Sequence, residues 1–208
     1  DQLQDWNQLG RYHADNEALK SQGPAAGRVV FLGDSITDGW KLAAYFRGKP
    51  YVNRGISGQT TPQMLVRFYR DVVNLGPAAV IILAGTNDIA RNTGPETADM
   101  IQDNFQAMAE LARAHNIKVI LCSLTPVSDY GKTPQTARRP PADILKLNAW
   151  LRDYAARTGA IYADYFTPLA DEKGFLRQGL SEDGLHPNAK GYELMAPVSE
   201  TAISKALQ

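Results

Sequence analysis

The stretch Arg28-Val-Val-Phe-Leu-Gly-Asp-Ser-Ile-Thr-Asp-Gly-Trp40 carries most of the information about the fold. A continuous apolar run is typical of a strand buried in a parallel sheet, and Val29–Leu32 is such a run, ended by Gly33. Asp34 and Ser35 therefore follow the carboxyl end of a strand, which is the edge where open α/β sheets bind ligands. Ser35 is a candidate nucleophile there, although Gly-Asp-Ser alone is more often a turn or a helix cap.

The rest of the chain alternates short apolar runs with helix-like stretches. Five runs are strand candidates: Val29–Leu32, Tyr51–Asn53, Ala79–Leu83, Lys118–Cys122 and Ala160–Ala163. Between them, three sets of apolar residues recur at helical spacing: Met64, Leu65, Phe68, Val72 and Leu75; Ile101, Phe105, Met108 and Ala112; Ile144, Leu147, Leu151 and Tyr154. This alternation predicts a five-stranded parallel sheet with helices on both faces, joined by right-handed crossovers.

Both ends of the chain lie outside this alternation. Leu3, Trp6 and Leu9 predict an N-terminal amphipathic helix packed on the outside of the sheet. The stretch from Asn188 to Leu207 also has a helical pattern, and we expect Pro197 to kink or divide it.

The chain shows no linker, internal repeat or low-complexity tract, so we expect one domain over residues 1–208. Residues 1–27 would form a helical extension packed on that domain. The one long irregular segment, from Pro126 to Pro141, follows a strand. Loops of that length in compact domains are often functional, so we expect this segment to contact substrate.

Composition excludes several classes of protein. The chain has 208 residues, of which 44% are hydrophobic and 21% charged, as in an ordinary globular domain. Its 22 basic and 22 acidic residues cancel, and the largest basic cluster is Arg138-Arg139, so the sequence gives no support for nucleic-acid binding. No apolar run approaches the roughly 20 residues that span a bilayer, so we expect no membrane span.

Metal and cofactor sites are also unsupported by the sequence. The single Cys122 excludes an internal disulfide and a cysteine-rich metal site, and the Asp, Glu and His positions show no metal-ligand spacing. We therefore expect no metal and no cofactor. Oligomeric state stays open, and a first residue Asp1 fits a mature secreted or periplasmic product as well as a cytoplasmic one.

A histidine and an aspartate near the C-terminus complete a possible catalytic set with Ser35. Acyl transfer needs a nucleophile, a base and donors aimed at the developing oxyanion. In Asp183-Gly-Leu-His186, a tight turn through Gly184 could bring the Asp183 carboxylate to Nδ1 of His186, leaving Nε2 free for Ser35. The alternative is that Asp183 caps the C-terminal helix and that His186 is a surface residue.

Two further loops offer oxyanion donors. Gly58 follows the second strand, and without a side chain its backbone N–H can approach a ligand closely. Asn87 follows the third strand, and its side-chain amide could turn into the same site. Taken singly, Gly58 is more often a plain turn glycine and Asn87 a loop residue in left-handed geometry.

Together, these four segments resemble the blocks of the SGNH hydrolases, also called the GDSL esterase/lipase superfamily. Gly33-Asp-Ser-Ile36 resembles the first block, with Ile where Leu often stands, and Gly58 matches the second. Gly85-Thr-Asn-Asp88 matches the third block, and Asp183-Gly-Leu-His186 matches the last. The blocks occur in the family's order and extend over most of the chain. Within the superfamily, the chain looks most like bacterial relatives of platelet-activating-factor acetylhydrolase catalytic subunits.

The resemblance implies a flavodoxin-like three-layer α/β/α sandwich and a metal-independent serine mechanism. It assigns roles to individual residues: Ser35 as nucleophile, His186 as base, Asp183 to orient His186, and the Ser35 N–H, Gly58 N–H and Asn87 side chain as the oxyanion hole, with Asp34 and Asp88 in support.

The expected function is hydrolysis of a small-molecule or carbohydrate ester through an acyl-Ser35 intermediate. No long apolar stretch suggests a lid for long-chain lipids, so short acyl groups such as acetyl are favoured. An acyltransferase with the same triad, a lysophospholipase or a thioesterase are alternatives, and a non-catalytic binding module is least favoured. Thr37 stands where the Gly-x-Ser-x-Gly elbow of α/β-hydrolases needs its second Gly, and no strand leads into a dinucleotide-binding or P-loop motif.

Overall fold

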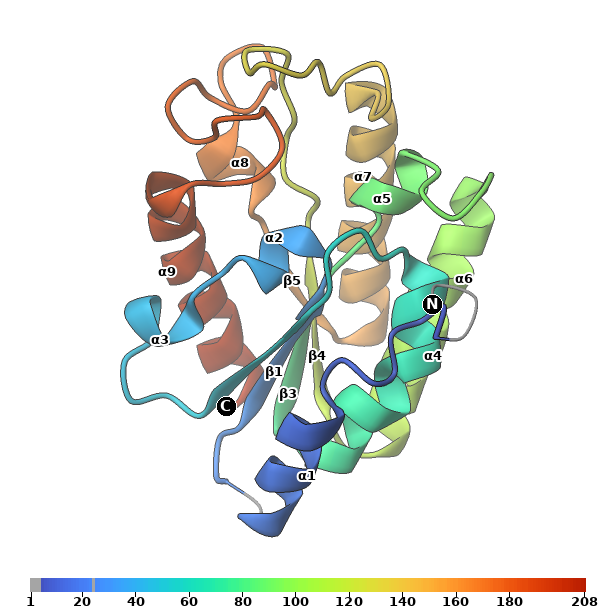
Figure 1. The fold of residues 1–208 in the computed structure, drawn as a ribbon, viewed down its shortest axis with the longest axis vertical. Helices are drawn as coiled ribbons and strands as arrows, with labels where there is room; N and C mark the ends of the chain where they lie inside the picture. The colour runs from blue at the N-terminus through green and yellow to red at the C-terminus, as the bar shows by residue number, and fades with distance from the viewer. Residues whose placement is uncertain (1–4, 24) are drawn as a thin grey trace.

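A five-stranded parallel sheet lies between two layers of helices (Figure 1). The computed structural model describes residues 5–23 and 25–208. The strand order is β2-β1-β3-β4-β5, and each neighbouring pair is parallel. The strands are β1 (Val29–Gly33), β2 (Tyr51–Gly55), β3 (Ala79–Leu83), β4 (Lys118–Cys122) and β5 (Ile161–Ala163). The predicted flavodoxin-like three-layer fold is confirmed.

The two faces of β1 show why its sequence is apolar throughout. Val30 and Leu32 pack into the core beneath one helical layer, and Val29 and Phe31 pack into the core beneath the other. A strand that is covered on both faces must be hydrophobic at every position.

The helices divide between these two cores. One layer consists of α4 (Thr61–Asp71), α6 (Ala98–Ala114) and α7 (Pro141–Thr158), and the opposite layer is dominated by α9 (Ala189–Ala206) (Figure 1). The shorter elements are α1 (His13–Ser21), α2 (Ser35–Asp38), α3 (Leu42–Tyr45), η1 (Val73–Leu75), α5 (Thr86–Ile89) and α8 (Phe166–Leu169). None of the helices in the described part of the chain combines the length and apolar character needed to cross a membrane.

The N-terminal helix lies later in the chain than predicted. The expected helix through Trp6 and Leu9 is wrong, since residues 5–12 form turns and α1 begins at His13. Both oxygens of the Asp5 carboxylate accept backbone N–H groups, from Leu9 at 2.8 Å and from Gly10 at 2.9 Å. Such local side-chain bonds compete with helix formation. The predicted helical residue Leu3 lies outside the described residues.

Of the two outcomes expected at Pro197, a kink or a division of the helix, the division is wrong, because α9 continues through this residue. Met195 is fully buried, and Ala202 and Ile203 lie in the same core, so packing on the sheet holds the helix on both sides of the proline. Tertiary packing of this kind outweighs the local cost of one missing backbone donor. The Ser199 hydroxyl also donates to the Met195 carbonyl at 3.2 Å.

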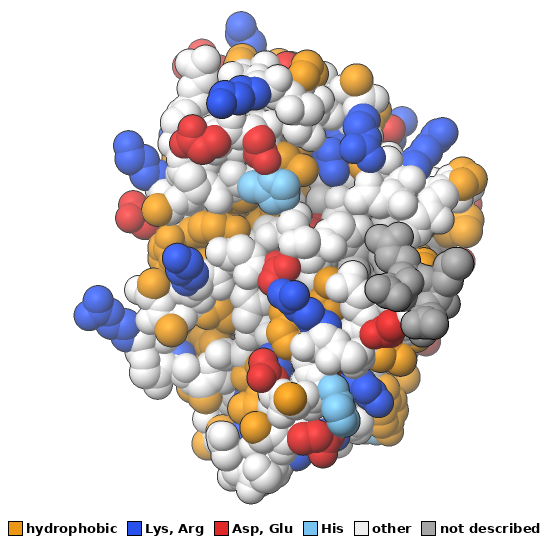
Figure 2. Space-filling view, in the orientation of Figure 1, with side chains coloured by type: hydrophobic (Ala, Val, Ile, Leu, Met, Phe, Trp, Pro, Cys, Tyr) orange, Lys and Arg blue, Asp and Glu red, His pale blue; other side chains and the backbone are white. Residues whose placement is uncertain are grey.

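Positive and negative side chains are interspersed over the face seen in Figure 2, in keeping with the balanced composition. Helix α4 contains a buried charge pair. Arg67 and Asp71 of α4 form an ion pair at 3.0 Å, and their side chains are 0% and 2% exposed. Arg67 also donates to the Gln59 side chain at 2.6 Å and to the Gly33 carbonyl at 3.1 Å.

Removal of Asp71 should therefore strongly destabilise the fold. Asp71→Ala leaves the buried Arg67 guanidinium without its counter-charge, and we expect a loss of about 3–5 kcal/mol in the free energy of unfolding. Chemical denaturation measures this loss. Asp153→Ala, at an exposed position of α7, is the matched control and should change stability by less than about 0.5 kcal/mol. Equal effects from the two variants would contradict the expectation.

Candidate active site

The turn that follows β1 presents Ser35 at the start of a helix. Asp34 caps α2, because its Oδ1 accepts the Ile36 N–H at 2.9 Å. Gly33 leaves no room for a side chain: a Cβ would lie 2.1 Å from the Thr37 hydroxyl. The helix-cap interpretation thus holds for Asp34, and the cap places the half-buried Ser35 at the carboxyl edge of the sheet.

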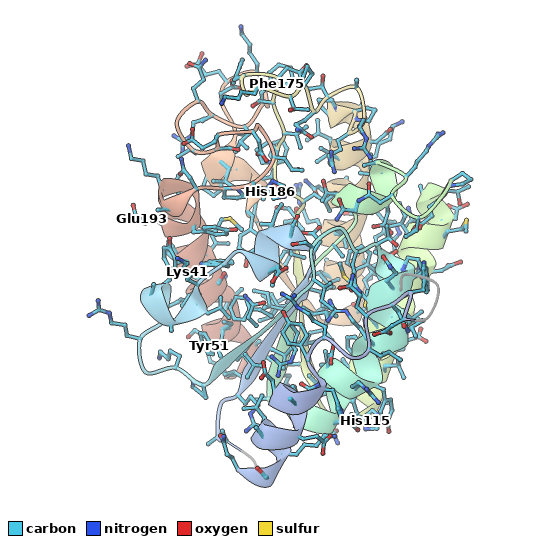
Figure 3. All side chains as sticks on the ribbon, in the orientation of Figure 1. Lys41, Tyr51, His115, Phe175, His186 and Glu193 are labelled. Carbon is cyan, nitrogen blue, oxygen red and sulfur yellow. The ribbon has the colours of Figure 1, made fainter. Side chains whose placement is uncertain are left out.

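Three side chains from two distant segments form one hydrogen-bonded chain. Ser35 Oγ lies 2.8 Å from His186 Nε2, and His186 Nδ1 lies 2.6 Å from Asp183 Oδ2. Figure 3 shows His186 beside α2, on the segment that leads into α9. Asn188 caps α9 in place of Asp183, because its side chain accepts the Lys190 N–H. The alternative role of Asp183 as the helix cap is therefore absent.

Local hydrogen bonds keep Asp183 ionised. Partial burial alone would raise the pKa of this carboxyl, but hydrogen bonds from the His186 ring and from the backbone N–H groups of His186 and Leu185 hold it well below its usual range. A carboxylate can only accept a hydrogen bond, so Nδ1 of a neutral His186 carries the proton. Its Nε2 is then free to accept the Ser35 hydroxyl proton. The catalytic roles of the three residues stay predictions.

The long loop between β4 and α7 packs against the Asp183–His186 turn. Gly184 has φ 79°, and a Cβ there would lie 2.2 Å from the Ser128 carbonyl oxygen. Ser128 N–H donates to the Gly184 carbonyl at 2.8 Å. A Cβ on Gly131 would lie 2.6 Å from the Asp183 backbone. The loop thus supports the turn, and its expected contact with substrate stays a prediction.

Gly58 lies in the loop that follows β2, and Asn87 lies in α5, shortly after β3. Gly58 has φ 81°, which favours glycine, and its missing Cβ faces open space. Within residues 5–23 and 25–208, the Gly58 N–H makes no hydrogen bond. The buried Asn87 donates through Nδ2 to the Gln59 carbonyl at 3.1 Å, while its Oδ1 accepts from Arg139 at 3.2 Å. Their function as oxyanion donors stays a prediction.

The two supporting aspartates are buried and hard to ionise. Burial raises the pKa of Asp34 to about 6. Burial, together with neighbouring Glu96, raises the pKa of Asp88 to about 8. Asp88 also accepts the Thr61 backbone N–H at 2.9 Å and so joins α5 to the start of α4. Both residues shape the loops that carry Ser35 and Asn87.

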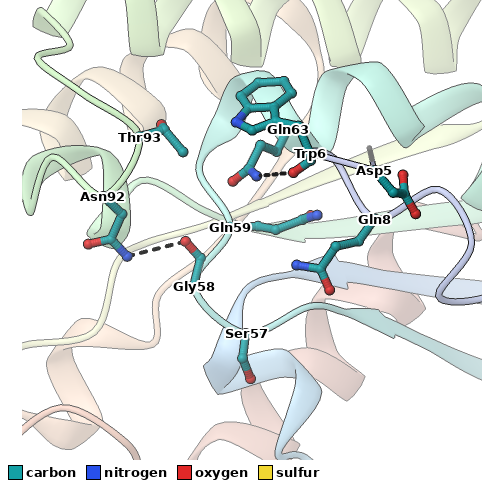
Figure 4. A pocket seen from close by; sticks show the side chains of 9 residues that line it. All are labelled: Asp5, Trp6, Gln8, Ser57, Gly58, Gln59, Gln63, Asn92 and Thr93. Atoms are coloured by element: carbon teal, nitrogen blue, oxygen red, sulfur yellow. Dashed lines mark hydrogen bonds between the residues drawn. The ribbon is translucent and has the colours of Figure 1, made fainter. Parts of the chain in front are cut away.

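Two hollows meet at the exposed Ser57. A shallow recess of about 490 Å³ is lined by Ser35, Asp38, Gly39, Ser57, His186, Pro187 and Tyr192. A larger groove of about 740 Å³ is lined by Asp5, Trp6, Gln8, Ser57, Gly58, Gln59, Gln63, Asn92 and Thr93 (Figure 4). Sequence reasoning did not find this groove, because one of its walls is the N-terminal segment, far from the four blocks.

The N-terminal segment is fixed against the Gly58 loop. Gln63 donates to the Trp6 carbonyl at 2.7 Å, and Gln59 donates to the Asn7 carbonyl at 2.9 Å. In the part of the chain that the structure describes, no group of three or more His, Cys, Asp or Glu side chains is placed to hold a metal ion.

Comparison with known proteins identifies the family. Residues 31–194 match the GDSL-like Lipase/Acylhydrolase family, and the chain belongs to it. A candidate acylhydrolase from Bacteroides fragilis has a solved structure with a TM-score of 0.91 and 40% identity, covering 98% of this chain and 99% of its own. Esterase TesA of Pseudomonas aeruginosa is 29% identical over 187 residues, 81% of this chain and 84% of its own length.

A third likeness concerns the fold. The structure named as a platelet activating factor protein from Streptococcus pneumonia is 24% identical, with a TM-score of 0.81, and covers 97% of this chain and 96% of its own. The predicted membership of the GDSL superfamily is confirmed. The chain is an ester-cleaving hydrolase with a small-molecule ester as substrate.

The raised pKa of Asp88 predicts a pH-dependent stability. Folding raises this pKa from 3.8 to about 8, so the native state binds the proton more tightly than the unfolded chain. The stabilisation is complete below pH 3.8 and is lost as the pH rises through about 8. The raised pKa of Asp34 causes a further loss of stability with rising pH, and this loss ends near pH 6.

Asp88→Asn keeps a neutral polar group at this position. It should remove the loss of folding stability that wild type shows between about pH 6 and 8. Urea unfolding at several pH values, with wild type and variant side by side, measures the difference. Identical slopes for the two proteins over this range would show that Asp88 does not titrate there.

Proposed function

We propose that this protein is a serine esterase that hydrolyses short-chain acyl esters, acetyl esters above all, through an acyl-Ser35 intermediate. The observation that carries the proposal is the continuous chain from Ser35 Oγ through His186 to Asp183, with contacts of 2.8 and 2.6 Å. Ser35 and His186 line the recess of about 490 Å³, where an ester carbonyl can reach the Ser35 hydroxyl.

The proposed reaction gives each of these side chains a role. His186 Nε2 takes the proton of Ser35 Oγ as this oxygen attacks the ester carbonyl carbon, and the ionised Asp183 stabilises the imidazolium that forms. The N–H groups of Ser35 and Gly58 and the Asn87 amide donate to the oxyanion. Collapse expels the alcohol, which receives the proton from His186. Water then repeats the sequence on the acyl-enzyme and releases the acid.

The shape of the recess supports a short acyl group. Apart from small or polar residues, only Pro187 and Tyr192 add apolar surface around Ser35 and His186. Among the residues that the structure describes, the lining of the adjoining groove offers amides, hydroxyls, one carboxylate and the half-exposed Trp6 ring, without a lysine or arginine. Its chemistry suits a polar, uncharged alcohol portion better than an acyl chain or a phosphate. An acyltransferase with the same residues is the alternative, and product analysis with a competing alcohol distinguishes it.

The proposal predicts that Ser35 becomes acylated. A fluorophosphonate should label Ser35 and abolish hydrolysis of p-nitrophenyl acetate, and Ser35→Ala should fold but lose both the label and the activity. Mass spectrometry locates the label, and a series of p-nitrophenyl esters should show turnover falling with acyl length. Ser57→Ala, at the neighbouring serine, should keep the label. Near wild-type turnover by Ser35→Ala would refute the mechanism.

Asn87 should act in the transition state. Its donated hydrogen bond strengthens as negative charge develops, so its removal should lower kcat and leave KM almost unchanged. For Asn87→Ala we expect a loss of about 10²–10³ in kcat. Asn87→Asp should be at least as damaging, since it places a like charge opposite the oxyanion.

Kinetics and melting temperature should be measured on the same preparations. If Asn87 only shapes its loop, Asn87→Ala will lower the melting temperature and leave kcat within a few-fold of wild type. That result would remove Asn87 from the oxyanion hole.

A further inference from the structure

Each arginine of the basic pair Arg138-Arg139 donates to the side-chain oxygen of an asparagine. Arg139 Nη2 donates to Asn87 Oδ1 at 3.2 Å, and Arg138 Nη2 donates to Asn92 Oδ1 at 3.1 Å. Each asparagine then donates through Nδ2 to a carbonyl of the Gly58 loop: Asn87 to Gln59 at 3.1 Å, and Asn92 to Gly58 at 3.2 Å. Two parallel relays therefore connect the long loop to the candidate oxyanion hole.

The two relays differ in burial. Arg139 is 4% exposed and Asn87 is 3% exposed, whereas Arg138 and Asn92 are exposed to solvent. Hydrogen bonds from a charged donor are stronger than neutral ones, and a low local dielectric strengthens them further. The relay through Arg139 should therefore have much the larger effect.

The guanidinium sets the orientation of the Asn87 amide. Arginine donates hydrogen bonds and accepts none, so the amide oxygen must face Arg139 and the NH₂ group must face the Gly58 loop. Only this orientation offers an N–H to an oxyanion. The positive guanidinium of Arg139 beside Asn87 Oδ1 also polarises the amide, which makes its N–H a better donor.

Arg139 is itself held by the loop. Its Nη1 donates to the Gln135 side-chain oxygen at 2.9 Å, and the Gln135 amide donates to the Asp183 backbone carbonyl at 3.2 Å. Gln135 and Arg139 together thus connect the Asp183–His186 turn to Asn87. No described side chain accepts a hydrogen bond from Arg139 Nε.

We propose that Arg139 is a positioning residue of the oxyanion hole, which orients and polarises the Asn87 amide without touching the substrate. The proposal rests on the proposed function, because it assigns Arg139 an effect through Asn87. It accounts for a buried arginine that neither the triad nor the two hollows require.

The test is a double-mutant cycle. Arg139→Met keeps the length of the side chain and removes its charge and donors. We expect kcat for p-nitrophenyl acetate to fall on the order of 10–100-fold, as for loss of one charged hydrogen bond, with KM within a few-fold of wild type. In the Asn87→Ala background, the same substitution should cause no further fall in kcat, because the amide on which it acts is gone.

Three comparisons complete the experiment. Arg138→Met, in the exposed relay, should lower kcat far less than Arg139→Met. Arg113→Met, where the arginine contacts Tyr154 at the end of α6, controls for loss of any arginine and should leave kcat unchanged. Arg139→Lys keeps the charge with one nitrogen in place of three, so its kcat should fall between those of wild type and Arg139→Met.

Two results would overturn the proposal: unchanged kcat in Arg139→Met, or the same fall in both backgrounds, which would mean that Arg139 only supports the loop. If Arg139→Met does not fold, Arg139→Lys replaces it in the cycle with the same two outcomes. Failure of the proposed function is recognised by a different result. Ser35→Ala would then retain activity, whatever the kcat of the Arg139 variants.

Discussion

A buried guanidinium ties together three segments that meet at the candidate active site. Arg67 bonds to the carbonyl that ends β1, to the Gln59 side chain in the Gly58 loop, and to Asp71 one turn along α4. With the side chain fully buried, each bond forms in a low dielectric, and an unpaired charge there would be costly. The hydrogen bonds of Arg67 therefore fix the spacing between the loop that presents Ser35 and the loop that presents Gly58.

Local sequence patterns were enough to predict the sheet and the four blocks. The strand bounds agree to within two residues, since strands buried on both faces are marked by apolar runs that any tertiary context preserves. Because the strands are parallel, the residues after each run had to converge on one edge. The contact between Ser35 and His186, 151 positions apart, follows from this topology and from the turn at Gly184.

Features that depend on distant partners could not be predicted. The groove wall at Trp6 forms because Gln59 and Gln63 bind the backbone of the N-terminal segment, and no periodicity in that segment indicates such contacts. The continuity of α9 through Pro197 depends on core packing that outweighs a local helix breaker. Arg139 appeared in the sequence only as half of a small basic cluster, since its burial and its bond to Asn87 arise from the long loop.

The close packing of Gly131 on Asp183 and of Gly184 on Ser128 has a consequence for engineering. Neither glycine can take up a side chain unless the opposing backbone moves, so these two loops must change together, and a graft of one without the other would displace His186. Substitutions aimed at a new ester are better placed in the groove, where the side chains of Trp6 and Gln8 lie apart from the contact between Asp183 and His186.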